Sequence, residues 1–177
     1  WQDKESQINY FRVELLTKVL EKLKLELPEH LENHLNKKSE LDSKAYEFYL
    51  RGKFLIDQLK NKEDIIISRD LFKKAYDLDN SLTEANVYYG MSFFRLGEHN
   101  KAKKILDKNI DNLENETNIN KSMILNCMGI IYQYGMADYK KAIEFYNDAL
   151  EIQSKNDDKY NKVKTLNNIS HSYLCLE

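Results

Sequence analysis

The sequence predicts an all-α protein built from repeated pairs of helices. Three observations support this prediction: turn residues are scarce, apolar residues recur at helical spacing, and one segment recurs in register. The 177 residues include five glycines and one proline, too few for the many tight turns of an all-β domain. The apolar fraction of 42% suffices for one compact domain or one short array of repeats.

The charge balance of the chain argues against a nucleic-acid partner. Charged residues make up 32% of the sequence, yet the formal net charge is only −2. Proteins that bind nucleic acid usually carry a basic face instead. Lys101, Lys103 and Lys104 could form a local basic patch, but a solvated helix face is the preferred interpretation. We therefore expect no nucleic-acid partner.

The sequence shows no feature of a secreted or membrane protein. No apolar run approaches the ~18 residues of a membrane span, and no signal peptide is evident. Cys127 and Cys175 form no CxxC pair and lie in apolar helical patterns, as the reduced thiols of cytosolic proteins do. We therefore expect a cytoplasmic protein that contacts no membrane.

Residues 1–42 are expected to form an amphipathic helix followed by a linker. Apolar residues recur every three or four positions over 5–27, starting at Ile8, and so lie on one stripe of a helix. Pro28 breaks this helix or starts the next element. The segment is expected to cap the first repeat, because a repeat in an array cannot bury its own apolar face. The alternatives are that it dimerises the chain or links it to an upstream domain.

One segment recurs along the chain at intervals of about 40 residues, as in repeat proteins. Large residues flank a glycine in AYEFYLRGKFLI, TEANVYYGMSFF and SMILNCMGIIYQ, which contain Gly52, Gly90 and Gly129. A fourth copy, VKTLNNISHSYL, has Ser170 at this place. Each of the first three is followed by a second helical segment with alanines, which are Ala75, then Ala102, then Ala142 and Ala149. The repeating unit is therefore helix, turn, helix.

These positions resemble the tetratricopeptide repeat, which has a glycine on helix A and two alanines around an aromatic residue on helix B. The third repeat is the most similar, with Leu125, Met128, Gly129, Tyr132, Ala142, Tyr146 and Ala149. The second has Asn109 in place of the last alanine, and the first has Ser68 in place of the first alanine after a few extra residues. The resemblance implies a right-handed α-solenoid over residues 43–177. Its repeats are expected at about 45–80, 83–116 and 122–155, with a partial fourth at 159–177.

The sequence also predicts the conformation of two turns and the exposure of the C-terminal end of the array. Gly97 and Gly135 lie in the second and third turns, where each is expected to end helix A in the left-handed conformation. The fourth repeat has only helix A. Ile169, Tyr173 and Leu176 are therefore expected to be exposed, and either further repeats or an intermolecular contact is expected to cover them.

The first repeat also resembles a narrower group of bacterial proteins. In that group, tetratricopeptide arrays follow an adenylate/guanylate cyclase domain or a transcriptional-regulator domain. The likeness lies in AYEFYLRGKFL, in DLFKKAYDLDNSLTEA and in the preceding helix with Gln7 and Ile8. It implies a regulatory segment of a larger bacterial signalling enzyme, acting through self-association of the N-terminal helix or of the open C-terminal face.

No catalytic or metal-binding constellation is evident in the sequence. The chain has no GxxxxGK[ST], GxGxxG or GxSxG motif, so the usual signatures of nucleotide binding and of serine hydrolases are missing. His30 and His34 are four residues apart on a possible short helix, but they lack the HExxH order and a third ligand. We therefore expect no cofactor, no metal and no enzymatic activity in this segment.

Stacked helix pairs curve, and in the family the A helices line the concave side and supply most ligand contacts. Transferred to this sequence, the contact positions are Tyr49, Lys53, Ile56, Asp57, Val87, Met91, Phe94, Arg95, Asn126, Ile130, Gln133, Tyr134, Asn167, His171 and Leu174. The resemblance implies a non-catalytic interaction module, or scaffold, that binds a protein or peptide in this groove. The alternative is that neighbouring helices cover these side chains and that the groove binds nothing.

Some members of the family clamp the C-terminal carboxylate of a chaperone between lysines and asparagines. Lys53 and Asn126 have suitable side chains for this, but Val87, Met91 and Ile130 occupy other clamp positions. The clamp is therefore disfavoured. We expect an apolar and aromatic trough with a polar rim, which suits an amphipathic helix or an extended peptide.

Overall fold

The computed structural model describes residues 43–58 and 61–176, and these form helices and short connections without a strand. The expected N-terminal helix and linker at 1–42 lie outside the described residues. The α-helices are α3 (Ser43–Gln58), α4 (Lys62–Leu78), α5 (Thr83–Arg95), α6 (His99–Asp111), α7 (Asn118–Ile130), α8 (Tyr139–Lys155) and α9 (Lys159–Leu174). A 3₁₀ turn, η1 (Leu113–Asn115), precedes α7, and a π-helical turn, η2 (Ile131–Gly135), follows it.

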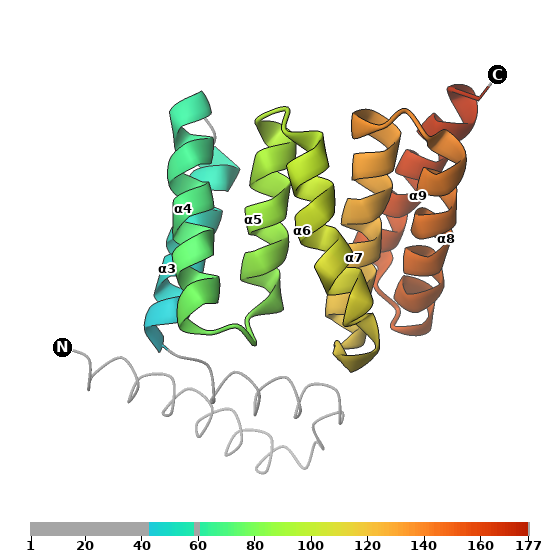
Figure 1. Ribbon diagram of the computed structural model, residues 1–177. Helices are drawn as coiled ribbons and strands as arrows, with labels where there is room; N and C mark the ends of the chain where they lie inside the picture. The colour runs from blue at the N-terminus through green and yellow to red at the C-terminus, as the bar shows by residue number, and fades with distance from the viewer. Residues whose placement is uncertain (1–42, 59–60, 177) are drawn as a thin grey trace, which may run out of the picture.

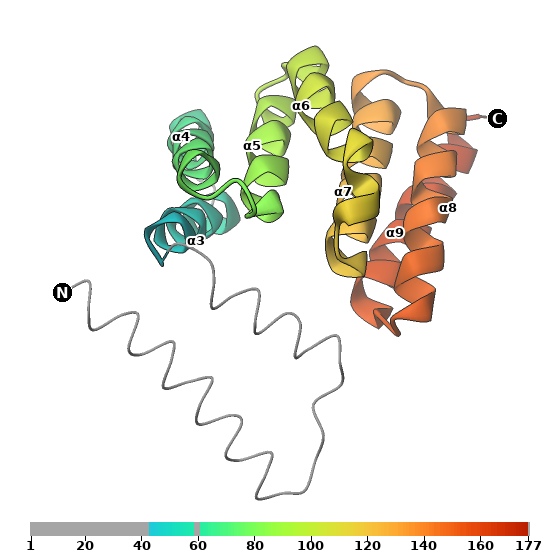
Figure 2. The same cartoon turned by 60° about the horizontal axis from the view of Figure 1, so that its bottom comes forward.

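The helices form an array in which each packs against the next in the chain. Figure 1 shows this row from α3 to α9. In Figure 2 the row bends into an arc, with α3, α5, α7 and α9 on its inner side. We call these the A helices and α4, α6 and α8 the B helices. The predicted fold class, an all-α array of helix-turn-helix repeats, is confirmed.

Small side chains let the helices of this array approach one another. Ala75, Ala102, Ala142 and Ala149 on the B helices are completely buried. Ala102 and Ala142 belong to one apolar cluster that joins the second and third repeats and also includes Leu106, Met128, Ile131, Tyr132, Tyr146 and Ile169. Burial of this shared surface is the main source of stability in a repeat array, because no repeat has a core of its own.

The extra residues of the first repeat lengthen a helix instead of a loop. In α4, six residue steps separate the first residue, Lys62, from Ser68, which occupies the first small position. In α6, only three steps separate His99 from Ala102. The added turn of α4 begins at Asn61, whose side chain accepts a hydrogen bond from the backbone N–H of Asp64 at 2.9 Å. Such a cap satisfies one of the donors left free at a helix start.

Of the two glycines predicted to end an A helix in the left-handed conformation, one does so and the other does not. Gly97 has a φ of +81°, and the N–H of Glu98 donates to the carbonyl of Phe93 at 2.9 Å, as expected for a helix end in the left-handed conformation. Gly135 does not have this conformation. It lies in the π-helical turn, which carries the chain further before it reverses, and Ala137 takes the positive φ of 54° instead.

The C-terminal end of the array exposes one side of α9. Tyr173 is 56% exposed and Leu176 is 42% exposed, as expected. The expectation for Ile169 was wrong, because this side chain is buried in the cluster shared with α7 and α8. The exposed side of α9 is therefore the side that would face a following B helix.

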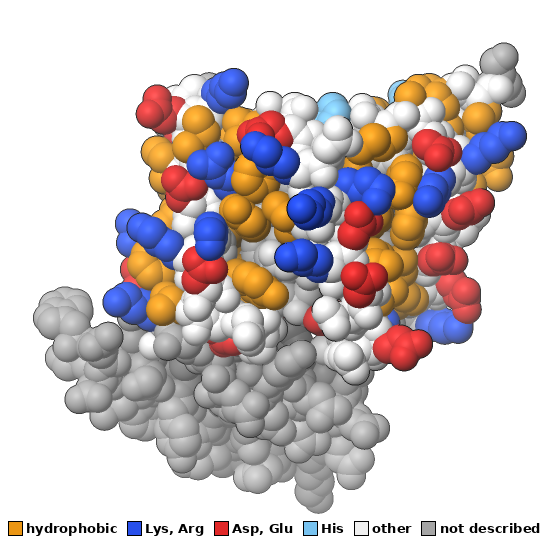
Figure 3. Space-filling model, viewed as in Figure 1, with side chains coloured by type: hydrophobic (Ala, Val, Ile, Leu, Met, Phe, Trp, Pro, Cys, Tyr) orange, Lys and Arg blue, Asp and Glu red, His pale blue; other side chains and the backbone are white. Residues whose placement is uncertain are grey.

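The outer face of the array, formed by the B helices, is a mixture of charges. Figure 3 shows basic and acidic side chains interspersed with apolar ones on this face. Lys103 contacts Asp107 at 2.7 Å, one helical turn away, and Lys101 pairs with Glu98. Exposed pairs of this kind add little stability, but they show that two lysines of the 101–104 cluster have acidic neighbours. The cluster is thus part of a mixed, solvated face.

Candidate binding groove

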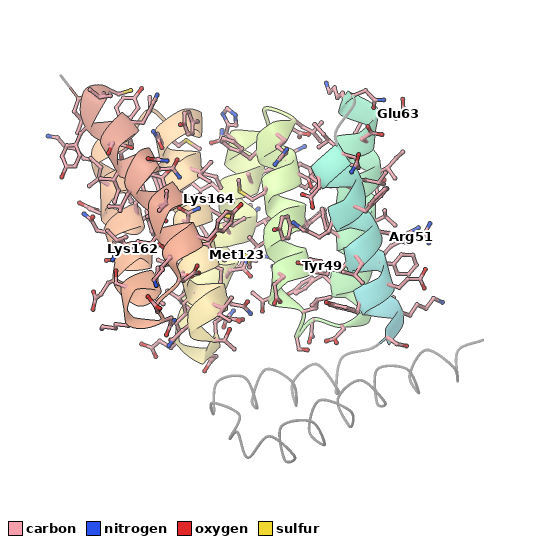
Figure 4. All side chains as sticks on the ribbon, turned by 180° about the vertical axis from the view of Figure 1, so that it is seen from behind. Tyr49, Arg51, Glu63, Met123, Lys162 and Lys164 are labelled. Carbon is pink, nitrogen blue, oxygen red and sulfur yellow. The ribbon has the colours of Figure 1, made fainter. Side chains whose placement is uncertain are left out.

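A pocket of about 450 Å³ opens among the A helices. Its lining comes from all four of them and from no B helix: Ile56, Tyr88, Met91, Ser92, Arg95, Asn126, Cys127, Ile130, Lys164, Asn167 and Asn168. In Figure 4 the A helices face the viewer, with Tyr49 of α3 and Lys164 of α9 on this side. The pocket therefore lies on the inner side of the arc and spans every repeat of the array.

Helical periodicity brings the lining residues to one side of each helix. On α5, Tyr88 lies three and four residues before Met91 and Ser92, and Arg95 lies four and three residues after them. Residues at these spacings lie on one face of an α-helix. Asn126 and Ile130 on α7, and the lining residues 164, 167 and 168 on α9, repeat the pattern. The pocket thus combines three such faces with one residue of α3.

The floor of the pocket is apolar, and hydrogen-bond donors are available beside it. Met91 and Ile130 are half-buried and pack against the main apolar cluster. The hydroxyl of Ser92 donates to the carbonyl of Tyr88 within α5 at 2.8 Å. The Oδ1 atom of Asn126 accepts a hydrogen bond from Thr165 at 3.3 Å, which leaves the Asn126 amide N–H groups available to a ligand.

The charges that line the pocket are both positive. Arg95 and Lys164 line it, and no aspartate or glutamate does so. The ammonium of Lys164 lies 4.0 Å from the centre of the Tyr160 ring, a cation–π contact that leaves its charge uncompensated. Within the described part of the chain, neither cation forms an ion pair.

The thiol of Cys127 is a neutral group at the edge of this pocket. Burial raises its pKa to about 12. The thiolate is the nucleophilic form of cysteine, so a raised pKa makes the side chain unreactive near neutral pH. Cys127 therefore contributes apolar surface to the pocket and is unsuited to nucleophilic chemistry.

Comparison with known families identifies the repeat type. Residues 81–155, which span α5 to α8, match the family model described as tetratricopeptide repeat. This part of the chain belongs to the tetratricopeptide repeat family. No curated protein matches the sequence. The α3/α4 pair and α9 flank the matched tetratricopeptide repeats and pack onto them in the same manner.

The tetratricopeptide groove contains six of the positions transferred from the family. Ile56, Met91, Arg95, Asn126, Ile130 and Asn167 line the pocket. Tyr49 and Lys53 lie beside it, at the contact between α3 and α5. The Lys53 ammonium donates to the hydroxyl of Tyr88 at 3.0 Å, and the ring of Tyr49 lies 5.9 Å from that of Tyr88. Both side chains thus hold the first repeat against the second.

Two other transferred positions lie in the interior. Val87 is only 1% exposed and Gln133 only 2%, so neither offers a side-chain surface to a ligand in this structure. Gln133 bridges two helices: its Oε1 accepts from the hydroxyl of Tyr146 at 2.7 Å, and its Nε2 lies 2.8 Å from Nδ1 of His171. Burial raises the pKa of Tyr146, which keeps its hydroxyl protonated as the donor.

The remaining transferred positions lie outside the pocket. Phe94 is half-buried and packs on the ring of His99, with the ring centres 5.0 Å apart. His171 is exposed and is held by Gln133, and its ring lies 5.7 Å from that of Tyr134. Gln133, Tyr134 and His171 thus join the turn after α7 to α9, whereas Phe94 and His99 meet within the second repeat.

Five lining residues were not among the transferred positions: Tyr88, Ser92, Cys127, Lys164 and Asn168. The sequence signal that could have found them is their helical spacing from the transferred positions. Lys164 lies three residues before Asn167, and Tyr88 lies three residues before Met91. A search for neighbours at three- and four-residue spacings on each A helix finds both.

Two other features, a metal site and a membrane-spanning helix, are absent from the described part of the chain. No group of three or more His, Cys, Asp or Glu side chains within it is arranged to hold a metal ion. His30 and His34 lie outside the described residues. None of the helices within the described ranges is long and apolar enough to cross a bilayer.

Proposed function

We propose that this protein is a non-catalytic interaction module that holds a peptide segment of a partner protein in the pocket among its A helices. The observation that carries the proposal is the lining of that pocket, which is shared by α3, α5, α7 and α9 and by no B helix. A ligand there contacts every repeat at once. Tetratricopeptide repeats serve in general as protein-interaction modules, which supports the same function.

The chemistry of the groove suits a peptide. Ile56, Met91 and Ile130 give it an apolar floor, and Asn126 and Asn167 supply amide groups beside that floor. Peptide recognition commonly combines an apolar contact for a side chain with hydrogen bonds to the main chain. An amphipathic helix or an extended segment can make both kinds of contact here.

A peptide array screened with the purified protein tests this function. Short peptides of mixed sequence that bind the wild type are expected to lose binding to Met91→Glu and Ile130→Glu, because a buried carboxylate would face the apolar floor. Ile67→Glu is the matched control, since Ile67 is an exposed residue of the B helix α4. The proposal fails if no peptide binds, or if the groove variants bind as the control does.

The exposed side of α9 supports self-association as a second candidate function. Leu166 and Tyr173 are 42% and 56% exposed. The corresponding residues of the third repeat, Leu125 and Tyr132, are buried against α8. A second copy of the chain can cover this apolar stripe through a symmetric contact of two α9 helices. Analytical ultracentrifugation at high protein concentration tests the contact, which Leu166→Glu should weaken; a wild-type monomer would exclude it.

The alternative context is a regulatory segment of a larger bacterial signalling enzyme, such as an adenylate/guanylate cyclase. Its support is the likeness of the first repeat, AYEFYLRGKFL, to that group. The test is the sequence that precedes Trp1 in the complete gene. A catalytic domain there would support this context, and the absence of one would end it.

A further inference from the structure

We infer that the groove recognises an acidic peptide segment, whose carboxylates lie at Arg95 and Lys164 while an apolar side chain contacts Met91 and Ile130. The inference rests on the proposed function and specifies the chemistry of the partner. It follows from the two cations that line the pocket and from the lack of an acidic partner for either of them among the described residues.

Several cations of the array already have an acidic partner, whereas these two do not. Lys53 contacts Asp57 at 3.6 Å and Lys73 contacts Asp77 at 2.6 Å. Arg95, in contrast, is exposed in the last turn of α5 and has no carboxylate partner in the described part of the chain. Lys164 lies over the ring of Tyr160 and also lacks a carboxylate partner among the described residues. Both charges are thus available to a ligand without the loss of an existing ion pair.

The pocket concentrates positive potential although the whole chain is slightly acidic. The formal net charge is −2, but the lining contains two cations and no carboxylate. A concave surface lined by one sign of charge and backed by apolar side chains focuses the field at its mouth. Anionic groups are therefore attracted to this side of the molecule.

The hydrogen-bonding groups of the pocket agree with an anionic ligand. The amide of Asn126 has its oxygen engaged by Thr165 at 3.3 Å, so its remaining capacity is to donate. Asn167 and Asn168 line the pocket beside Lys164 and add two more amide groups. Carboxylate oxygens accept hydrogen bonds and donate none when ionised. A carboxylate therefore satisfies the free donors of this surface.

A peptide fits these observations better than a nucleic acid. Two cations neutralise only two phosphates, whereas stable binding of a nucleic acid normally needs a longer basic track. The apolar floor of Ile56, Met91 and Ile130 also needs an apolar partner. A segment in which aspartate or glutamate alternates with an aliphatic or aromatic residue meets both requirements.

The test compares fluorescein-labelled 12-residue peptides that are rich in apolar residues and carry either Asp/Glu or Lys/Arg at the other positions. Fluorescence anisotropy with the wild type is expected to show tighter binding of acidic peptides, weakening as salt rises. The double variant Arg95→Gln, Lys164→Gln should bind them about 2- to 30-fold more weakly, as expected for two solvent-exposed charge pairs. It should also lose most of the salt dependence.

The matched control is Lys104→Gln, Lys140→Gln, which removes two exposed charges from the B helices α6 and α8 and should leave binding unchanged. The reversal Arg95→Glu, Lys164→Glu should shift the preference to basic peptides.

Four outcomes would overturn the inference. If acidic and basic peptides bind equally well and Met91→Glu alone abolishes binding, the acidic partner is excluded while the proposed function stands. If the Lys104 and Lys140 control weakens binding as much as the groove variant, Arg95 and Lys164 are not the residues that bind the carboxylates. Tighter binding of an RNA 12-mer, lost in the groove variant, would replace the peptide by nucleic acid. If the wild type binds none of the peptides, the proposed function fails as well.

Discussion

The ring of Tyr146 on α8 packs directly on the backbone of Gly129 on α7. A Cβ atom added at Gly129 would overlap Cε1 of that ring. The same relationship joins the other two pairs, with Leu106 on Gly90, and with Phe72 on Gly52, where an added Cβ would lie 2.7 Å from Cε1 of the ring. Each glycine weakens its own helix by roughly 1 kcal/mol relative to alanine. In return, the B helix approaches the A helix closely enough to bury a large side chain.

Gly129→Leu should therefore destabilise the fold. The new side chain has to displace Tyr146 from a completely buried position, and overpacking of this kind typically lowers the free energy of unfolding by ~1–3 kcal/mol. Chemical denaturation followed by circular dichroism measures the change. Ser170→Leu is the control, because Ser170 occupies the equivalent position on α9 and is exposed. A similar loss in both variants would show that the close helix approach is not the cause.

The hydrogen bond between Tyr146 and Gln133 should stabilise the third repeat. Gln133→Met keeps the length of the side chain but leaves the buried hydroxyl of Tyr146 without the acceptor that now lies 2.7 Å away. An unsatisfied buried polar group lowers stability by about 1–3 kcal/mol. Tyr146→Phe alone should also destabilise the fold, since Gln133 then loses its donor.

The double variant Gln133→Met, Tyr146→Phe separates this hydrogen bond from packing. Since both polar partners are removed together, its loss of stability should be clearly smaller than the sum of the two single losses. Denaturant midpoints of the wild type, the two single variants and the double variant give the four stabilities that this comparison needs. Additive losses would mean that the two groups do not depend on each other.

The repeat pattern was predictable because it depends on the sizes of the side chains, which the sequence gives directly. A glycine that recurs at one phase of a helix, followed by alanines on the next helix, reports close packing at each occurrence. The charge of Arg95 and the apolar character of Met91 and Ile130 could also be assigned to the groove, since one family position on each A helix fixes the rest of that face.

Other features depend on helix rotation and long-range pairing, which spacing does not reveal. Val87 and Gln133 lie one or two positions away from the exposed stripe and point into the core. The partner of Gln133 on α9, His171, is 38 residues away. The π-helical turn after α7 rotates the chain before it reverses, so that Ala137, and not Gly135, takes the left-handed conformation. No local conformational preference in the sequence predicts that π-helical turn.

Asn109 departs from the family pattern, and restoring that pattern should be harmful. Its Oδ1 accepts a hydrogen bond from Nδ2 of Asn86 at 3.1 Å, and its own Nδ2 donates to the carbonyl of Ile105 at 3.2 Å. Both asparagines are buried. Asn109→Ala leaves the amide of Asn86 without this partner, so the free energy of unfolding should fall by about 1–3 kcal/mol.

The third repeat suggests the compensating change. There, Leu125 and Ala149 occupy the positions of Asn86 and Asn109. The double variant Asn86→Leu, Asn109→Ala should therefore be more stable than Asn109→Ala alone, because an apolar pair replaces a broken polar one. Thermal unfolding temperatures compare the two directly. A gain in stability from Asn109→Ala by itself would contradict the role assigned to this hydrogen bond.

The two cysteines should differ in their reaction with a thiol reagent. Burial raises the pKa of Cys127 to about 12, whereas Cys175 is exposed. At pH 8 a thiol with this pKa is about 0.01% thiolate, compared with about a quarter for an ordinary cysteine of pKa ≈ 8.5. Cys175→Ser should therefore react on the order of 1000-fold more slowly than Cys127→Ser.

The pH dependence of that reaction identifies the cause of the slow rate. Below its pKa, the thiolate fraction of a cysteine rises tenfold per pH unit, so the reaction of Cys127 should still accelerate about tenfold per unit between pH 8 and 10. An ordinary thiol would level off above a pH of about 8.5. Absorbance of the released chromophore follows both variants. A plateau for Cys127 in this range would mean that steric access, and not the raised pKa, limits its reaction.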